Sequence, residues 1–235
     1  MQFHGYTGSC GDWQDKLQFA ALGYSVVSMD VRGQGGQSQD TGNVLGNTHH
    51  GHIIRGLDDK PDNLFFRQVF LDTAQLTSIV MELPEVDETR VAAAGGSQGG
   101  ALALACAALE PGWPESPPTF LFYAITSGFG KWTWPKTLMR SCALISDYSI
   151  LSISRKMAFF TRLGYIDIQY LAPRIRAEVL AGVGLMDTVC PPSSQFAALN
   201  KISSPLQLEI YPDFAHENLP GMQDKVYQFF NGIVG

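Results

Sequence analysis

A serine stands at the centre of a glycine-rich segment, Gly95-Gly96-Ser97-Gln98-Gly99. Apolar residues that favour a strand precede this segment, and an alanine- and leucine-rich run that favours a helix follows it. A sharp turn from strand to helix exposes a serine hydroxyl and needs glycine wherever a side chain would collide with neighbouring backbone. The pattern therefore predicts that Ser97 is a nucleophile, with Gly95 and Gly99 as the glycines that the turn requires.

A serine hydroxyl attacks efficiently only when a base removes its proton. His216 is the only histidine that follows Ser97 in the chain, and it comes after an expected strand at 206–211. Hydrolases built on this turn carry their residues in the order serine, acid, histidine. Asp187 directly follows another expected strand and is predicted to be the acid that orients the imidazole.

Two other aspartates compete for the role of the acid. Asp213 lies too close to His216 along the chain to come from a separate strand end. Asp167 precedes the expected strand at 178–183 and is expected to be structural.

An oxyanion needs backbone N–H donors. One donor is predicted to be the N–H of Gln98, the residue after the nucleophile. The chain opens with Phe-His-Gly-Tyr-Thr-Gly, and the N–H of Tyr6 in this loop is the natural second donor. His4 is interpreted as a structural support of the loop and not as a base.

The hydrophobic pattern predicts strands that alternate with helices. Helices are expected at 14–22, 65–83, 98–109, 193–199 and 224–233. Strands are expected at 24–29, 90–94, 178–183 and 206–211, with a further apolar run at 119–126. Such alternation indicates one α/β domain over residues 1–235, with a mostly parallel sheet flanked by helices on both faces.

Composition narrows the class of protein. The chain has 235 residues, of which 45% are hydrophobic, and a net charge of −6, which argues against nucleic acid or an anionic membrane as a partner. It contains no apolar run long enough to cross a bilayer and no secretory signal at its start. The scattered cysteines are expected to be free thiols, which favours a reducing compartment. They are Cys10, Cys106, Cys142 and Cys190.

A small histidine cluster, His49, His50 and His52, raises the question of a metal site. These histidines share one glycine-rich loop, whereas metal sites need fixed ligand geometry and usually draw on several elements. We expect neither a metal nor a cofactor.

Three short motifs together carry a family resemblance: Arg32-Gly33-Gln34-Gly35, the Ser97 segment and His216-Glu217. They resemble carbohydrate esterase family 7, the acetyl xylan esterases and cephalosporin C deacetylases. The resemblance implies an α/β-hydrolase fold and removal of acetyl groups from short acetylated xylo-oligosaccharides and from cephalosporin C. It also implies a hexamer in the cytoplasm.

The same resemblance assigns residue roles. It makes Ser97, Asp187 and His216 the catalytic triad, with Tyr6 and Gln98 as oxyanion donors. The remaining motif residues are expected to be structural, and the guanidinium of Arg32 can pin neighbouring loops. They are Arg32, Gly33, Gln34, Gly35, Gly95, Gly99 and Glu217.

The resemblance covers residues 1–111 and 160–235. Members of the family carry further residues ahead of the oxyanion loop, so this chain is expected to be truncated and to lack the first strands of the sheet. Segment 112–158 does not resemble the family. A pair of compensating frameshifts is our hypothesis for it, and a divergent lid is the alternative. We expect low order in 130–158 and little activity.

Two other functions remain open. The chain could be a different α/β-hydrolase, such as a serine peptidase or a dienelactone hydrolase, although the latter would favour a cysteine where Ser97 stands. It could also be a non-catalytic fragment that keeps the motifs without a working site.

Overall fold

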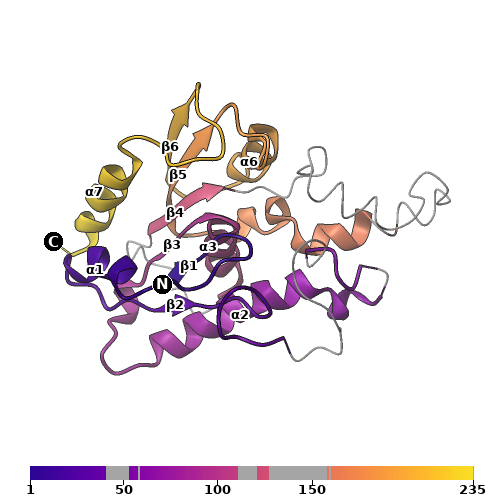
Figure 1. Ribbon diagram of the computed structural model, residues 1–235, viewed down its shortest axis with the longest axis horizontal. Helices are drawn as coiled ribbons and strands as arrows, with labels where there is room; N and C mark the ends of the chain where they lie inside the picture. Colours follow the sequence, from indigo (N-terminus) through magenta and orange to yellow (C-terminus); the bar gives the residue numbers. More distant parts are fainter. Residues whose placement is uncertain (41–52, 58, 111–120, 127–157, 159, 235) are drawn as a thin grey trace.

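The computed structural model describes residues 1–40, 53–57, 59–110, 121–126, 158 and 160–234. Its centre is a sheet with the strand order β2-β1-β3-β4-β5-β6, in which every pair of described neighbours is parallel (Figure 1). The strands are β1 (Gln2–Phe3), β2 (Ser28–Met29), β3 (Ala93–Ser97), β4 (Leu121–Thr126), β5 (Glu178–Gly184) and β6 (Leu206–Tyr211). The α/β-hydrolase architecture expected from the sequence is confirmed.

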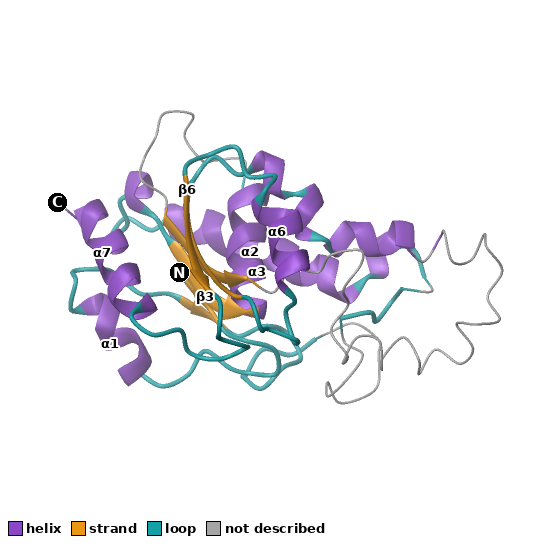
Figure 2. Ribbon diagram, turned by 90° about the horizontal axis from the view of Figure 1, so that it is seen from above, coloured by secondary structure: helices purple, strands orange, loops and turns teal. Residues whose placement is uncertain are grey.

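Helices cover both faces of this sheet. Figure 2 shows α2, α3 and α6 on one face and α1 and α7 on the other. The helices are α1 (Gln14–Ala20), α2 (Phe65–Met81), α3 (Gln98–Leu109), α6 (Pro192–Leu199) and α7 (Met222–Val234). Short 3₁₀ turns lie at Pro61–Asn63, Glu88–Arg90, Gly164–Ile166, Ile168–Tyr170 and Ala172–Arg174.

The two faces are separated by the alternation of side chains along each strand. Ala93 joins the apolar cluster on the α2 and α3 face, whereas Ala94 joins the cluster formed with α1 and α7. In β5, Val179 and Leu180 divide between the same two clusters. Strands buried on both faces must be apolar throughout, which explains their lack of hydrophobic–polar alternation.

Helix α3 is buried from Gln98 to Ala108. It packs between the sheet and α2, and this close packing is possible because many of its side chains are small alanines. This position fixes the first turn of α3, where the predicted nucleophile segment ends.

Some predicted strands have other bounds. The strand expected at 24–29 is reduced to Ser28–Met29, the strand expected at 90–94 is shifted to Ala93–Ser97, and β1 was not predicted. The apolar run at 119–126 forms β4 at Leu121–Thr126. The rest of the atypical segment lies outside the described residues apart from Ala158, so the low order expected at 130–158 stays a prediction.

Two further expectations concern the cysteines and a membrane. Cys10, Cys106 and Cys190 are free thiols, and Cys142 lies outside the described residues. Within the described part of the chain, no helix is long and apolar enough to span a bilayer.

The contact between α3 and β1 gives a first prediction. A Cβ on Gly99 would overlap the carbonyl oxygen of Phe3, which is backbone and cannot move aside cheaply. We expect Gly99→Ala to lower the free energy of unfolding by about 3 kcal/mol, measured by urea denaturation. Gly164→Ala is the control, because its Cβ would meet only the Tyr170 ring, at 3.5 Å or more. Equal free energies of unfolding in the two variants would contradict the close contact between Gly99 and the Phe3 carbonyl.

Candidate active site

Ser97 ends β3 and precedes the first residue of α3. Its backbone has φ 56° and ψ −123°, a conformation that costs a non-glycine residue about 1–3 kcal/mol. A Cβ on Gly95 would overlap the backbone of Gly99, so position 95 requires glycine, as position 99 does because of its contact with the Phe3 carbonyl. The turn has the geometry of a nucleophile elbow, which lifts the serine hydroxyl clear of the sheet.

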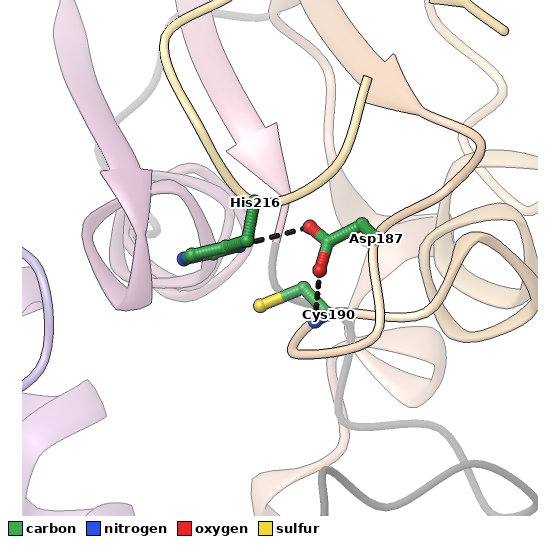
Figure 3. A group of neighbouring side chains, drawn as sticks. All are labelled: Asp187, Cys190 and His216. Atoms are coloured by element: carbon green, nitrogen blue, oxygen red, sulfur yellow. Dashed lines mark hydrogen bonds and ion pairs between the residues drawn. The ribbon is translucent and has the colours of Figure 1, made fainter. Parts of the chain in front are cut away.

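Asp187 and His216 are hydrogen-bonded to each other. The Nδ1 of His216 lies 2.8 Å from Oδ2 of Asp187 (Figure 3). Because an ionised carboxylate only accepts, Nδ1 carries the proton, and in the neutral form of the ring Nε2 is the acceptor that a serine hydroxyl needs. Asp187 is buried and His216 is partly exposed, as expected for an orienting acid and a base that must meet a substrate.

The sheet brings these residues to one edge. Ser97 ends β3, Asp187 follows β5, and His216 follows β6. Strands β3, β4, β5 and β6 are adjacent and parallel, so their carboxyl ends meet at the same edge. Ligand and catalytic sites of open parallel sheets lie at this edge.

Backbone hydrogen bonds hold the loop of the acid. Oδ1 of Asp187 accepts from the N–H groups of Val189 at 2.8 Å and Cys190 at 2.7 Å. Only Oδ2 then faces the imidazole. The carboxylate therefore has a fixed orientation before any substrate binds.

The loop that carries His216 is held against the end of β5 and the residues that follow it. The N–H of Met186 donates to the carbonyl of Phe214 at 3.0 Å. A Cβ on Gly184 would lie 2.5 Å from that carbonyl oxygen, so the glycine allows the loop to cross β5. Glu217 closes the loop on itself, because its Oε1 accepts from the N–H of Ala215 at 2.9 Å.

Electrostatics favour a protonated imidazole. The Asp187 carboxylate, followed by the Cys190 side chain, raises the pKa of His216 well above its ordinary value of 6.5. Burial opposes this shift more weakly.

The competing aspartates occupy other positions. Asp167 is buried, and its Oδ1 accepts from the N–H of Gln169 at 3.1 Å at the start of a 3₁₀ turn. That contact is a structural cap. Asp213 is exposed. Asp187, and neither of these, contacts His216 within the described residues.

The loop after β1 passes beside the elbow. A Cβ on Gly5 would lie 4.0 Å from the Cβ of Ser97. Tyr6 follows Gly5 directly, and Gln98 begins α3, where the N–H groups of the first turn have no partner within the helix. Both predicted oxyanion donors therefore lie on segments that flank Ser97.

His4 supports this loop through both ring nitrogens. Its Nε2 accepts from the N–H of Val31 at 3.0 Å, so its Nδ1 carries the proton and donates to the carbonyl of Gly5 at 2.7 Å. The interpretation of His4 as a structural support and not a base agrees with these contacts.

The Arg32–Gly35 motif lies against the loop after β1. The guanidinium of Arg32 makes a bidentate hydrogen bond with Asp72 of α2. The N–H of Gly35 donates to the carbonyl of Gly8 at 2.9 Å, and Gly33 has φ 63°, a conformation that favours glycine. The motif ties the loop to the body of the protein.

Cys190 is the residue that sequence reasoning missed. One ligand atom from each of Asp187, Cys190 and His216 lies within 4.8 Å of the others. These types can bind a metal ion, but here the Asp187 and His216 atoms bond to each other. The spacing Asp-x-x-Cys was the available signal. His49, His50 and His52 lie outside the described residues.

The chain is similar to known acetyl xylan esterases. A family model for acetyl xylan esterase (AXE1) matches residues 1–233. Acetyl xylan esterase 1 from Thermoanaerobacterium sp. JW/SL YS485 is 48% identical with a TM-score of 0.88, covering 100% of this chain and 74% of that one. An acetyl xylan esterase from Paenibacillus sp. R4 is 30% identical with a TM-score of 0.84, covering 98% of this chain and 72% of that one.

A curated relative is more distant. Acetyl esterase Axe7A of Xylanibacter ruminicola is 25% identical over 202 residues, which make up 84% of this chain and 44% of the relative. The chain therefore spans less than half the length of that relative. Because the family model covers nearly all of its residues, the chain belongs to the acetyl xylan esterase (AXE1) family, within the α/β-hydrolase superfamily.

Proposed function

We propose that the chain is a serine esterase that removes acetyl groups through a covalent acyl-enzyme. The observation that carries this proposal is the hydrogen bond between His216 and Asp187, at the sheet edge where the strained Ser97 turn ends β3. Membership of the AXE1 family supports the same chemistry.

The proposed reaction has two steps. Nε2 of His216 takes the proton of the Ser97 hydroxyl as Oγ attacks the acetyl carbonyl. The resulting oxyanion accepts hydrogen bonds from the N–H groups of Tyr6 and Gln98. The imidazolium then protonates the leaving alcohol, and water, activated by the same histidine, releases acetate from Ser97. Asp187 keeps the imidazole in the required tautomer and stabilises its charge.

The names of two relatives support a proposal for the substrate. Two solved structures named acetyl xylan esterases, together with the resemblance of the motifs, support short acetylated xylo-oligosaccharides as substrates. The resemblance alone extends the proposal to cephalosporin C, to a hexameric assembly and to the cytoplasm. The steps described above use only groups of this chain and water.

Hydrolysis of p-nitrophenyl acetate tests the function. We expect the full chain to hydrolyse this ester slowly, in line with the little activity expected from its atypical segment. Ser97→Ala should lose at least about 10³-fold of that kcat, because serine and histidine act as a unit. Ser203→Ala is the control, since this exposed serine precedes β6 at the opposite edge of the sheet.

Two outcomes of this assay would contradict the proposed function. Activity that survives in Ser97→Ala near the wild-type rate would reject Ser97 as the nucleophile. A wild-type chain that melts cooperatively but does not hydrolyse the ester would show a folded, non-catalytic protein.

The pH dependence of kcat/KM gives another prediction. Only neutral His216 can accept a proton, so kcat/KM falls as pH falls through its pKa. Because Asp187 raises that pKa, we expect the midpoint of the acid limb above pH 6.5 in the wild type. Asp187→Asn removes the largest cause, so the midpoint moves to lower pH while kcat drops about 10⁴-fold.

The His216 imidazole can also be titrated by NMR, which does not depend on residual activity. The control is Asp213→Asn, an exposed position where the profile should not move. A wild-type midpoint at or below 6.5, or one that Asp187→Asn leaves in place, would contradict the role of Asp187.

A further inference from the structure

Two motif glutamines form a reciprocal amide pair. Nε2 of Gln34 donates to Oε1 of Gln98 at 2.9 Å, and Nε2 of Gln98 donates to Oε1 of Gln34 at 3.0 Å. Gln98 is 3% exposed. The pair joins the Arg32–Gly35 motif to the first residue of α3.

Backbone groups at both ends fix the orientation of this pair. The N–H of Thr7 donates to Oε1 of Gln34 at 3.0 Å, and a backbone N–H can only donate. At the other end, the carbonyl of His4 lies 3.4 Å from Nε2 of Gln98 and can only accept. Flipping either amide would place two donors or two acceptors face to face, so one arrangement is selected.

The contacts reach both predicted sources of oxyanion donors. Thr7 directly follows Tyr6 and has φ 63°, an unusual conformation for a residue other than glycine. Gln98 contributes its own backbone N–H. The side chain of Gln34 therefore bonds to the neighbour of one donor and, through the amide pair, to the residue that carries the other.

We infer that Gln34 is a positioning residue that sets the separation of the Tyr6 and Gln98 N–H groups around the oxyanion. The inference rests on the proposed function. Oxyanion donors contribute most when they are aligned before charge develops, and removal of one donor costs about 10²–10³-fold in kcat in enzymes of this type. Loss of alignment is expected to cost less than loss of the donor.

Other contacts hold the fold of the loop without Gln34. Gly35 donates to the carbonyl of Gly8, and His4 accepts from Val31. A variant at Gln34 should therefore keep its structure and lose mainly catalytic rate. This separation of stability from rate makes the inference testable.

The test compares two variants of Gln34 in the full chain. Gln34→Met removes both hydrogen-bonding functions at similar size and without charge. Gln34→Glu keeps an acceptor for Thr7 but cannot donate to Gln98, and it adds a negative charge near the forming oxyanion. With p-nitrophenyl acetate, we expect kcat to fall about 10-fold in the first and about 100-fold in the second, on the scale of a lost oxyanion donor.

Controls separate positioning from charge and from folding. Gln37→Glu puts the same charge on an exposed residue of the same loop, and it should retain wild-type rates. We expect KM to change by less than about threefold and the thermal midpoint to stay near wild type. A double-mutant cycle of Gln34→Met with Gln98→Met should be strongly non-additive, because the two amides act through each other.

The outcomes are distinct from those of the esterase test. A wild-type chain without hydrolysis overturns the proposed function and this inference with it. An active wild type whose Gln34 variants match Gln37→Glu in kcat overturns the inference alone. So does a loss of rate that a lower thermal midpoint fully accounts for, because the role of Gln34 is then structural.

Discussion

The backbone contact between Gly99 and Phe3 sets the arrangement of the site. Here the first turn of α3 approaches the end of β1 so closely that no side chain fits at Gly99. The contact places the elbow that carries Ser97 beside the loop that begins at His4. Both flanks of the proposed oxyanion site are thereby defined by two neighbouring strands, β1 and β3, and by the turn that follows each of them.

The side chains of the proposed catalytic site are held largely by backbone groups of neighbouring loops. Two N–H groups fix the carboxylate of Asp187, and the Met186–Phe214 bond holds the loop that leads to His216. The loop after β1 is supported in the same way through Gly35. Backbone donors have no rotamers to lose, so they position a side chain more rigidly than a second long side chain would.

Local sequence patterns predicted the elements whose bounds depend mainly on their own residues. Helix α3 has the bounds expected from its sequence, and the hydrogen bond between Asp187 and His216 was expected from their order along the chain. Strand bounds were less predictable, because a strand extends only as far as its partner does. The apolar run at 24–29 pairs with β1 over Ser28–Met29 alone.

Two glycines concealed the true end of β3, and two contacts were not predictable because their residues lie far apart along the chain. Gly95 and Gly96 disfavour a strand locally, yet they pair with Ala124 and Ile125 of β4. Gln34 and Gln98 are 64 positions apart in the chain. Neither motif, taken by itself, indicates that these two side chains pair. The approach of Cys190 to His216 likewise depends on how two loops cross.

The backbone of Ser97 has a consequence for how such a protein can be improved. Its positive-φ conformation is present before any substrate arrives, so the folded chain carries about 1–3 kcal/mol of local backbone strain at this residue. Glycine would adopt the same turn without that strain, but it has no hydroxyl. A search for thermostability alone would therefore favour replacement of the proposed nucleophile, and selection for turnover would oppose that replacement. In this sense, the position proposed for the nucleophile is also a site where stability and activity cannot both be maximised.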